Sequence, residues 1–344
     1  SGKSEDRNLL SEDTLRANVA AIEKQMARLL DFDAGDSSAA LVNNYDWMSQ
    51  FGYLDFLRDI GKNFPVNVML AKDSVRSRLE RDDGGLSYTE FSYMLLQAFD
   101  FVTLYDKFQC QLQIGGSDQW GNIVSGMDLV RRKLSKEAFA LTVPLITKAD
   151  GTKFGKTAAG AVWLDANRTS PYSFYQFWLN SADADVEHFL KVFTFLDLDT
   201  ISTLMADLQE APQLRGAQRA LAREVTRLVH GDDPLASAER ITEALFAGEL
   251  QTLTEQDLEQ LRLDGMDCTE VSPGDGLIAV LADAGLAPSR GQARKLVMGN
   301  GVRLNGEVQS DPEATLKFDD ALHERFYLLR RGKKNWHLLV RRGA

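Results

Sequence analysis

Phe108-Gln109-Cys110-Gln111-Leu112-Gln113-Ile114, followed by Gly115-Gly116-Ser117-Asp118-Gln119-Trp120-Gly121-Asn122, is the stretch that decides the expected fold. Its first half alternates apolar and polar residues with a period of two, which predicts a strand with the glutamines on one face. A strand that runs through a glycine-rich turn into a helix is typical of an open α/β sheet, where ligands bind at the carboxyl ends of the strands. Gly115 and Gly116 would admit a ligand close to the backbone, and Asp118 could accept hydrogen bonds from ribose hydroxyls.

A polar stripe precedes this strand. Ser87-Tyr88-Thr89-Glu90 is a capping-box pattern, which predicts a helix that runs to about Asp100. Tyr93, Gln97 and Asp100 are four and three residues apart, so they share one side of that helix.

A third signal follows the strand, at Lys153-Phe154-Gly155-Lys156-Thr157. Two mobile ammonium groups and a hydroxyl on a glycine-containing loop suit a polyanion such as a phosphate. A P-loop is excluded because that motif needs a glycine at position 150, which is Asp. A solvated loop between two strands remains the alternative for this segment considered alone.

The composition is that of a soluble globular protein of two or three domains. The chain has 344 residues, 44% hydrophobic and 26% charged. We find no apolar run long enough to span a membrane and no signal-peptide pattern. Cys110 and Cys268 give neither a disulfide framework nor a metal spacing, which favours a cytoplasmic location and no protein-bound metal.

Helical patterns predict further elements on both sides of the strand. Residues 11–30 and 53–60 have helical spacing, and Ser170-Pro171 is a good helix start that opens a helical region reaching about Leu250. The polar, acidic residues 251–275 are interpreted as a linker. Asn305-Gly306 is a hairpin signal in a small last domain.

The charge of the chain is uneven. The net charge is −11, yet residues 289–344 contain 12 Lys and Arg against 6 Asp and Glu. A basic domain on an acidic body predicts a local polyanion-binding module, and a basic helix beside a basic hairpin suits RNA phosphates. The candidate RNA-binding residues are Arg290, Arg294, Lys295 and Arg303, with a solvated charged surface as the alternative.

These motifs, in this order, resemble those of the bacterial-type tyrosyl-tRNA synthetases, which are class I aminoacyl-tRNA synthetases. The stripe from Tyr93 to Asp100 resembles the tyrosine-binding helix, and residues 113–122 resemble the loop around substrate and ribose. Residues 153–157 resemble the family's KMSKS loop, and the region from about Gly276 resembles its C-terminal RNA-binding module.

The resemblance implies a Rossmann-type α/β catalytic domain over residues 1–165, of which only part is present. It further implies a helical anticodon-side domain (166–250), the linker (251–275) and a small α+β RNA-binding domain (276–344). The implied reaction is tyrosine–tRNA ligation, in which ATP activates L-tyrosine to tyrosyl-adenylate before transfer to tRNA(Tyr). Mg²⁺ is expected to accompany ATP, and a homodimer is expected, with its interface around residues 51–64.

The resemblance also assigns roles to residues. Tyr93 and Gln97 would hold the α-amino group of tyrosine, and Asp100 would accept a hydrogen bond from its phenol. Further implied roles are substrate contacts by Gln113 and Gln119, ATP contacts by Gly115, Gly116, Asp118 and Lys156, and stabilisation of the leaving pyrophosphate by Lys153, Lys156 and Thr157.

The chain departs from the family pattern at its beginning. No His-x-Gly-His motif occurs, and Ser1-Gly2-Lys3 resembles the continuation of a family segment cut just after a proline. We therefore expect an N-terminally truncated, inactive form in which Lys3 and Arg7 are surviving ATP ligands; a frayed polar terminus is the alternative for these two. A non-catalytic RNA-binding protein derived from a synthetase is the competing hypothesis for the whole chain.

Overall fold

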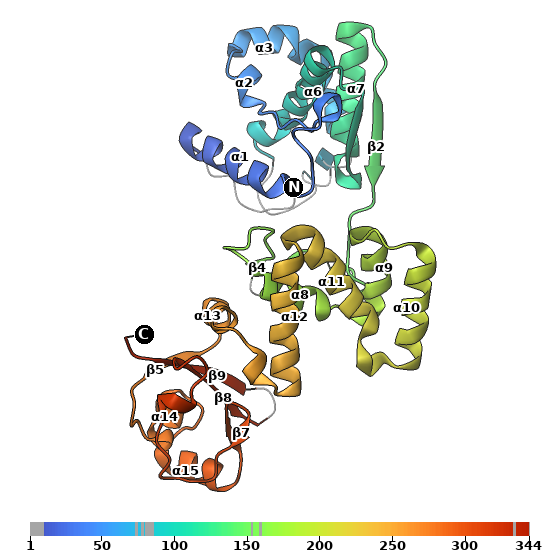
Figure 1. Ribbon diagram of the computed structural model, residues 1–344. Helices are drawn as coiled ribbons and strands as arrows, with labels where there is room; N and C mark the ends of the chain where they lie inside the picture. Colours follow the sequence, from blue (N-terminus) through green and yellow to red (C-terminus); the bar gives the residue numbers. More distant parts are fainter. Residues whose placement is uncertain are drawn as a thin grey trace. The chain divides into compact units, whose positions relative to one another are not determined.

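The computed structural model describes residues 10–72, 75–76, 79, 86–152, 154–157, 160–332 and 335–343, without the side chains of residues 156, 157 and 160. The chain folds into two compact units, Ser1–Phe154 and Gly155–Ala344 (Figure 1). No helix among the described residues is long and apolar enough to cross a membrane.

The first unit is organised around helix α6 (Tyr88–Phe108). Its capping box forms as predicted: the Ser87 hydroxyl accepts from the Glu90 amide, and the Glu90 carboxylate accepts from the Ser87 amide. The helix extends well beyond the predicted end at Asp100 and stops where Gln109 takes a left-handed conformation, with φ of 55°. The strand consequently begins later than predicted, because Phe108 is still helical.

Strand β1 (Leu112–Gly116) pairs in parallel with β2 (Phe139–Val143), from Leu112 opposite Phe139 to Gly116 opposite Val143. The 3-10 turn η3 (Ser117–Gln119) and helix α7 (Trp120–Leu134) connect them. This strand–turn–helix–strand unit confirms the predicted α/β organisation.

Helices α6 and α7 pack closely because Gly126 faces Phe101. A Cβ atom at position 126 would lie 2.9 Å from Cδ1 of Phe101. Phe101, Val102, Leu129 and Val130 form the centre of the core between the two helices.

One face of the two-stranded sheet is apolar and open. The exposed side chains are Leu112, Ile114, Phe139, Leu141 and Val143, which are between 46% and 61% exposed. The polar face is the opposite one, which carries Gln113.

Helices α1 (Glu12–Met26) and α3 (Tyr53–Asp59) confirm the helical patterns read from residues 11–30 and 53–60. The described residues of the first unit also form α2 (Tyr45–Met48), α4 (Val66–Leu70) and the 3-10 turns η1 (Gly35–Ser37) and η2 (Gly61–Asn63). Helix α1 contains no buried residue.

The second unit begins with a short hairpin and a bundle of helices. Ser170 caps the first helix and Pro171 is its first residue, as predicted. The elements are β3 (Lys156–Thr157), β4 (Gly160–Ala161), α8 (Pro171–Leu179), α9 (Asp183–Phe193), α10 (Leu198–Glu210), η4 (Pro212–Leu214), α11 (Gly216–His230) and α12 (Asp232–Ala247). Aromatic rings of α8 and α9 fill the bundle, with Trp178 lying 4.9 Å from Phe193 and 6.2 Å from Phe189 between ring centroids.

The segment 251–275 is not a linker, so this interpretation was wrong. It contains most of η5 (Leu250–Thr252), helix α13 (Glu255–Leu263) and strand β5 (Cys268–Val271). Strand β5 pairs in parallel with the last strand of the chain, from Cys268 opposite Leu338. The polar composition suggested a solvated segment, but carboxylates of α13 form ion pairs with Arg240 and Arg325.

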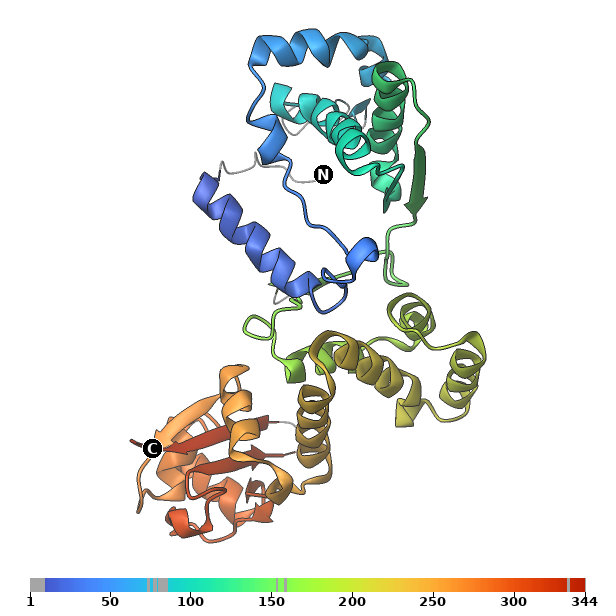
Figure 2. The ribbon, with the colours of Figure 1, turned by 45° about the horizontal axis from the view of Figure 1, so that its top comes forward.

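A five-stranded sheet in the order β5-β9-β8-β6-β7 completes the second unit (Figure 2). Its remaining elements are α14 (Leu277–Asp283), α15 (Arg290–Met298), β6 (Val302–Leu304), β7 (Glu307–Val308), η6 (Phe318–Asp320), β8 (Phe326–Arg331) and β9 (Asn335–Arg341). The hairpin predicted at Asn305-Gly306 is confirmed, with both residues at positive φ. Helices α14 and α15 cover one face of the sheet, and α12 and α13 pack on the other.

Candidate active site

A cavity of about 480 Å³ opens in the first unit between α1, α6, the segment 41–47, strand β1 and the turn η3. All five residues predicted to bind tyrosine line it: Tyr93, Gln97, Asp100, Gln113 and Gln119. The first three come from one side of α6, and Gln113 comes from β1. The cavity therefore forms where the polar stripe of the helix faces the polar side of the strand.

Asp100 is the best-defined polar group of the cavity. Its carboxylate accepts a hydrogen bond of 2.8 Å from the Trp47 indole N–H and one of 3.1 Å from the Asn44 amide. Burial raises the pKa of Asp100 above its ordinary value, and these two hydrogen bonds oppose the rise. The carboxylate is thus partly desolvated and held in one orientation.

Asn44 and Trp47 also line the cavity, and the sequence did not point to them. They lie 56 and 53 residues from Asp100 along the chain. The sequence signal for them is weak: two consecutive asparagines followed, three residues later, by a Trp in a short helix. This contact joins distant segments, which no local periodicity records.

Gln113 and Gln119 differ in how their amides are satisfied. The Gln113 side-chain oxygen is buried and accepts no hydrogen bond within the described part of the chain. The Gln119 amide donates to Asp118 at 3.3 Å, and its oxygen receives a bond of 3.5 Å from Asn122. A buried acceptor without a donor is costly, and a ligand N–H or O–H would offset that cost.

The glycine turn leaves little room for side chains. A Cβ atom at position 116 would lie 2.7 Å from Oδ1 of Asp118 and 2.9 Å from Leu145. At position 115 the nearest atom, on Ile123, would be 3.1 Å away. Glycine at position 116 therefore brings the backbone close to Asp118, whose side chain is exposed, and glycine at position 115 brings it close to Ile123 and Gln119.

Apolar side chains from α1 and α6 form part of the cavity wall around the polar groups. Helix α1 contributes Val19 and Ile22, and Leu104 comes from α6. The N-terminus of α1 is attached by a 3.1 Å hydrogen bond that Tyr45 donates to Glu12. An apolar cavity with a few oriented polar groups suits a small amphipathic ligand.

The loop that contains Lys153 and Lys156 (residues 153–157) is described only in part by the structure. Lys148 to Thr152 form a tight turn in which the Asp150 carboxylate accepts from the Thr152 amide at 2.9 Å. Gly151 and Gly155 have positive φ, as a bending loop requires. Lys153 lies outside the described residues, as do the side chains of Lys156 and Thr157 and the whole of Lys3 and Arg7.

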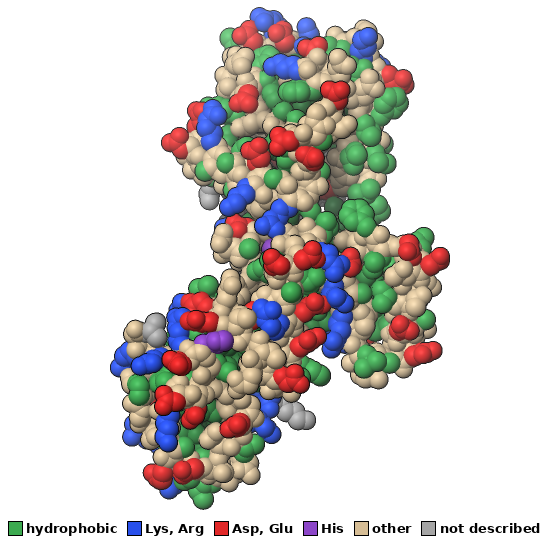
Figure 3. Space-filling view, in the orientation of Figure 1, with side chains coloured by type: hydrophobic (Ala, Val, Ile, Leu, Met, Phe, Trp, Pro, Cys, Tyr) green, Lys and Arg blue, Asp and Glu red, His purple; other side chains and the backbone are tan. Residues whose placement is uncertain are grey.

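The four candidate RNA-binding residues are not equivalent. Arg294 forms an ion pair of 2.9 Å with Glu313, and Arg303 donates to the Gly306 carbonyl at 2.8 Å. Arg290 and Lys295 are exposed on α15 and form no ion pair within the described residues. Figure 3 shows Lys and Arg side chains spread around the domain that contains β5–β9, with acidic groups among them.

Among the described residues, no group of three or more His, Cys, Asp or Glu side chains is arranged to hold a metal ion. Cys110 and Cys268 are free thiols.

Family comparisons match nearly the whole chain. Residues 1–247 match the family described as tRNA synthetases class I (W and Y), and residues 257–339 match the tyrosine–tRNA ligase SYY-like C-terminal domain. The chain belongs to the class I tyrosyl-tRNA synthetases. The boundary between the two matches falls just after α12, close to the predicted end of the helical region.

Individual relatives agree with this assignment. The synthetase is 56% identical over 337 residues to the tyrosine–tRNA ligases of Salmonella paratyphi B and Salmonella newport, covering 98% of this chain and 80% of each relative. A C-terminally truncated mitochondrial tyrosyl-tRNA synthetase from Aspergillus nidulans has a similar structure, with a TM-score of 0.57 and 31% identity over 71% of this chain and 72% of that one. The corresponding Coccidioides posadasii structure gives 0.55 and 32% over 68% and 69%.

Proposed function

We propose that this synthetase uses ATP to activate L-tyrosine as tyrosyl-adenylate and then transfers the tyrosyl group to tRNA(Tyr). The observation that carries the proposal is the cavity that gathers Tyr93, Gln97, Asp100, Gln113 and Gln119. A protein that only binds RNA would have no use for an oriented, partly buried carboxylate in an apolar cavity. The cavity therefore favours the enzyme over the RNA-binding alternative.

Asp100 would select tyrosine by accepting a hydrogen bond from its phenol. Trp47 and Asn44 hold the carboxylate in place, so little reorganisation would be needed when the substrate enters. Phenylalanine would remove water from the carboxylate without adding a third donor to those from Trp47 and Asn44, and a lone pair left without a partner on a buried acceptor is costly.

The other polar groups would hold the amino-acid backbone. Tyr93 and Gln97 share the side of α6 that carries Asp100, and we assign them to the α-ammonium group. The buried Gln113 oxygen has no donor within the described residues, so it would accept from the substrate. Gln119 would add a further contact from the glycine turn.

ATP would lie against the glycine turn, with Asp118 accepting from the ribose hydroxyls and Gly115 and Gly116 allowing close approach. Lys153, Lys156 and Thr157 would stabilise the charge that develops on pyrophosphate as it leaves; Lys3 and Arg7 remain proposed ATP ligands. The chemistry is attack by the tyrosine carboxylate on the α-phosphorus, which needs positioning and charge stabilisation more than proton transfer. Mg²⁺ would arrive on the ATP phosphates.

Two further assignments belong to the same proposal. Arg290 and Lys295, with lesser contributions from Arg294 and Arg303, would contact tRNA phosphates. Tyr53, Leu54 and Tyr88 are more than 60% exposed, and this aromatic and apolar surface would be the interface of a homodimer in the cytoplasm.

Binding of L-tyrosine and L-phenylalanine to the purified chain, measured by isothermal titration calorimetry, tests the proposal. We expect L-tyrosine to bind and L-phenylalanine to bind at least tenfold more weakly. Asp100→Asn should remove most of that preference. The matched control is Asp106→Asn, which changes an exposed carboxylate on the same helix and should leave both affinities unchanged. Equal affinity for the two amino acids in the unaltered chain would contradict the proposal.

A further inference from the structure

Helix α15 carries three exposed basic side chains, Arg290, Arg294 and Lys295. Arg290 lies in the first turn, where the positive end of the helix dipole disfavours a cation, and that turn contains no acidic residue. A cation at this place weakens the helix, so its use lies outside the helix. This is also the helix to which the proposed function assigns contacts with RNA phosphates.

One of the three cations is covered by a carboxylate. The Arg294 guanidinium lies 2.9 Å from the Glu313 carboxylate, and the two side chains are 52% and 75% exposed. No ion pair joins Arg290 or Lys295 to any residue that the structure describes. An ion pair exposed to this degree contributes little to the stability of a fold. Its main effect is on the charge that α15 presents to a ligand.

The backbone around Glu313 holds this residue in a defined turn. Residues 311–314 read Asp-Pro-Glu-Ala, and Asp followed by Pro is the preferred beginning of a type I turn. The Ala314 amide donates to the Asp311 carbonyl at 3.3 Å, which closes the turn. The Glu313 amide donates to Oδ1 of Asp311 at 2.9 Å. The position of Glu313 therefore follows from the sequence of the turn.

The same turn is attached to the core that supports α15. The Leu277 amide donates to the Ala314 carbonyl at 2.9 Å. Leu316 is 2% exposed and belongs to one apolar cluster with Leu277 and with Ala293 of α15. The carboxylate and the guanidinium thus face each other because their two segments pack on one core.

A neutralised cation behaves differently from a free one when RNA approaches. A free cation that meets a phosphate displaces the counterions of that phosphate, and the release of these ions drives binding. Arg294 would have to exchange Glu313 for the phosphate, and the displaced carboxylate would then repel the RNA backbone. The ion pair therefore removes one phosphate contact from α15 and leaves those of Arg290 and Lys295.

The loss of one contact would not affect all RNAs equally. A flexible single strand can move a phosphate to any free cation, whereas a folded tRNA holds its phosphates at fixed spacings. Sequence-independent binding depends almost wholly on such electrostatic contacts. A carboxylate on Arg294 would therefore weaken the binding of unstructured RNA more than the binding of tRNA(Tyr).

We propose that Glu313 is a specificity-determining residue, which limits the binding of unstructured RNA by neutralising Arg294 on α15. The inference rests on the proposed contact between α15 and RNA. Within that contact, Arg290 and Lys295 attract the RNA backbone, and Glu313 sets how many phosphates the helix can take.

Fluorescence anisotropy with a labelled oligouridylate and with labelled tRNA(Tyr), each at several salt concentrations, tests the proposal. In Glu313→Gln, one more phosphate contact becomes possible. We expect the affinity for oligouridylate at low salt to rise about three- to tenfold, and the slope of log affinity against log salt concentration to steepen by about 0.7. The affinity for tRNA(Tyr) should rise less. Arg294→Ala combined with Glu313→Gln should return the oligouridylate affinity to that of the parent, because the freed cation is gone.

Glu324→Gln is the matched control, because it removes the same charge from an exposed position of the same domain and should leave both affinities close to those of the parent. An unchanged oligouridylate affinity in Glu313→Gln, or an undiminished gain in the double variant, would overturn the inference. An equal gain for the two RNAs would overturn it too, since Glu313 would then set affinity and not preference. A parent that binds neither RNA would instead contradict the proposed RNA function and this inference together.

Discussion

In its proposed role, Asp100 is held ready for a substrate at a cost to the stability of the fold. Its carboxylate is partly desolvated, which raises its pKa, and hydrogen bonds from Trp47 and Asn44 oppose that rise. Residues that serve binding in this way are expected to reduce stability when the site is empty.

The pH dependence of stability should reveal this cost. A carboxyl group whose folded-state pKa is raised contributes stability that is present below its unfolded pKa and is lost as the pH rises through the folded pKa. We therefore expect Asp100→Asn to gain stability relative to the parent as the pH rises from about 4 into the neutral range. Urea unfolding at several pH values measures the difference, and Asp106→Asn provides the baseline. A difference that shrinks with rising pH would contradict the raised pKa.

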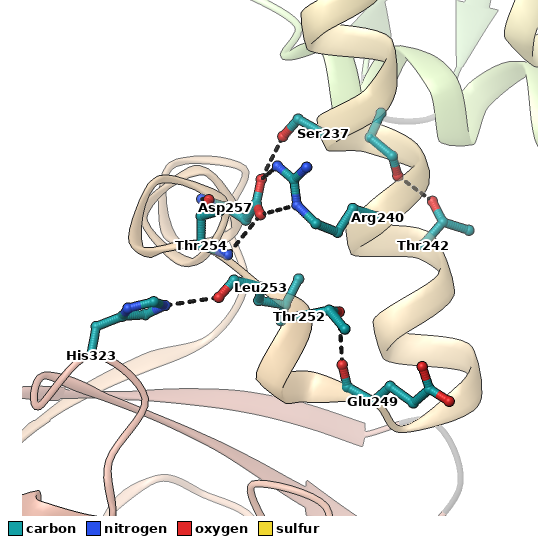
Figure 4. A network of polar contacts seen from close by, with 10 residues as sticks. Ser237, Arg240, Thr242, Glu249, Thr252, Leu253, Thr254, Asp257 and His323 are labelled. Carbon is teal, nitrogen blue, oxygen red and sulfur yellow. Dashed lines mark hydrogen bonds and ion pairs between the residues drawn. The ribbon is translucent and has the colours of Figure 1, made fainter.

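Much of the candidate site could be predicted from the sequence, because its residues lie within single elements that have clear sequence patterns. Tyr93, Gln97 and Asp100 lie on one capped helix, and residues 113–119 lie in one strand and its turn. Asn44 and Trp47 could not be predicted, since their role depends on a contact across more than 50 residues. The interpretation of 251–275 as a linker failed for a similar reason. The carboxylates of α13 suggested a solvated segment, but their partners Arg240 (Figure 4) and Arg325 lie 17 and 70 residues away in the sequence, beyond the reach of any local pattern.

At the scale of elements, the α6–α7 pair depends on one close contact. Gly126→Ala would place a Cβ atom 2.9 to 3.0 Å from Phe101, so we expect a loss of about 1–3 kcal/mol in the free energy of unfolding. Gly216→Ala is the control: nothing lies within 4 Å of its new Cβ atom at the start of α11, and the change should be neutral or stabilising. Chemical denaturation of both variants gives the comparison. Equal stability of the two would show that Phe101 can move aside.

On helix α15, Arg294 is paired with Glu313, whereas Arg290 and Lys295 form no ion pair with any residue that the structure describes. Arg290→Ala with Lys295→Ala should weaken tRNA binding at low salt and reduce the slope of log affinity against log salt concentration by about 1–2, because unpaired cations release counterions on binding. Arg294→Ala should have a smaller effect, since Glu313 already neutralises that side chain. Fluorescence anisotropy with labelled tRNA at several salt concentrations measures the slopes. An equal effect of both changes would argue that the Arg294–Glu313 pair opens in the complex.

At the scale of the whole molecule, the exposed surface of α3 is the proposed interface of the homodimer. Leu54 is 77% exposed, and Tyr53 and Tyr88 lie exposed as well. Leu54→Glu would place a charge in the interface, so we expect it to shift the sedimentation coefficient from that of a dimer to that of a monomer. Leu263→Glu, at a comparably exposed leucine of the second unit, is the control. A parent chain that sediments as a monomer at all concentrations would contradict the homodimer.

The open face of the β1–β2 sheet affects how this protein behaves in a concentrated solution. On this parallel pair of strands, the described residues leave an exposed apolar surface that consists of Leu112, Ile114, Phe139, Leu141 and Val143. Such surfaces self-associate, and excluded salts such as sulfate strengthen the tendency. The salt in the storage buffer, rather than the substrate, would then decide whether the protein self-associates. A single polar substitution such as Ile114→Thr would be the simplest way to reduce that self-association.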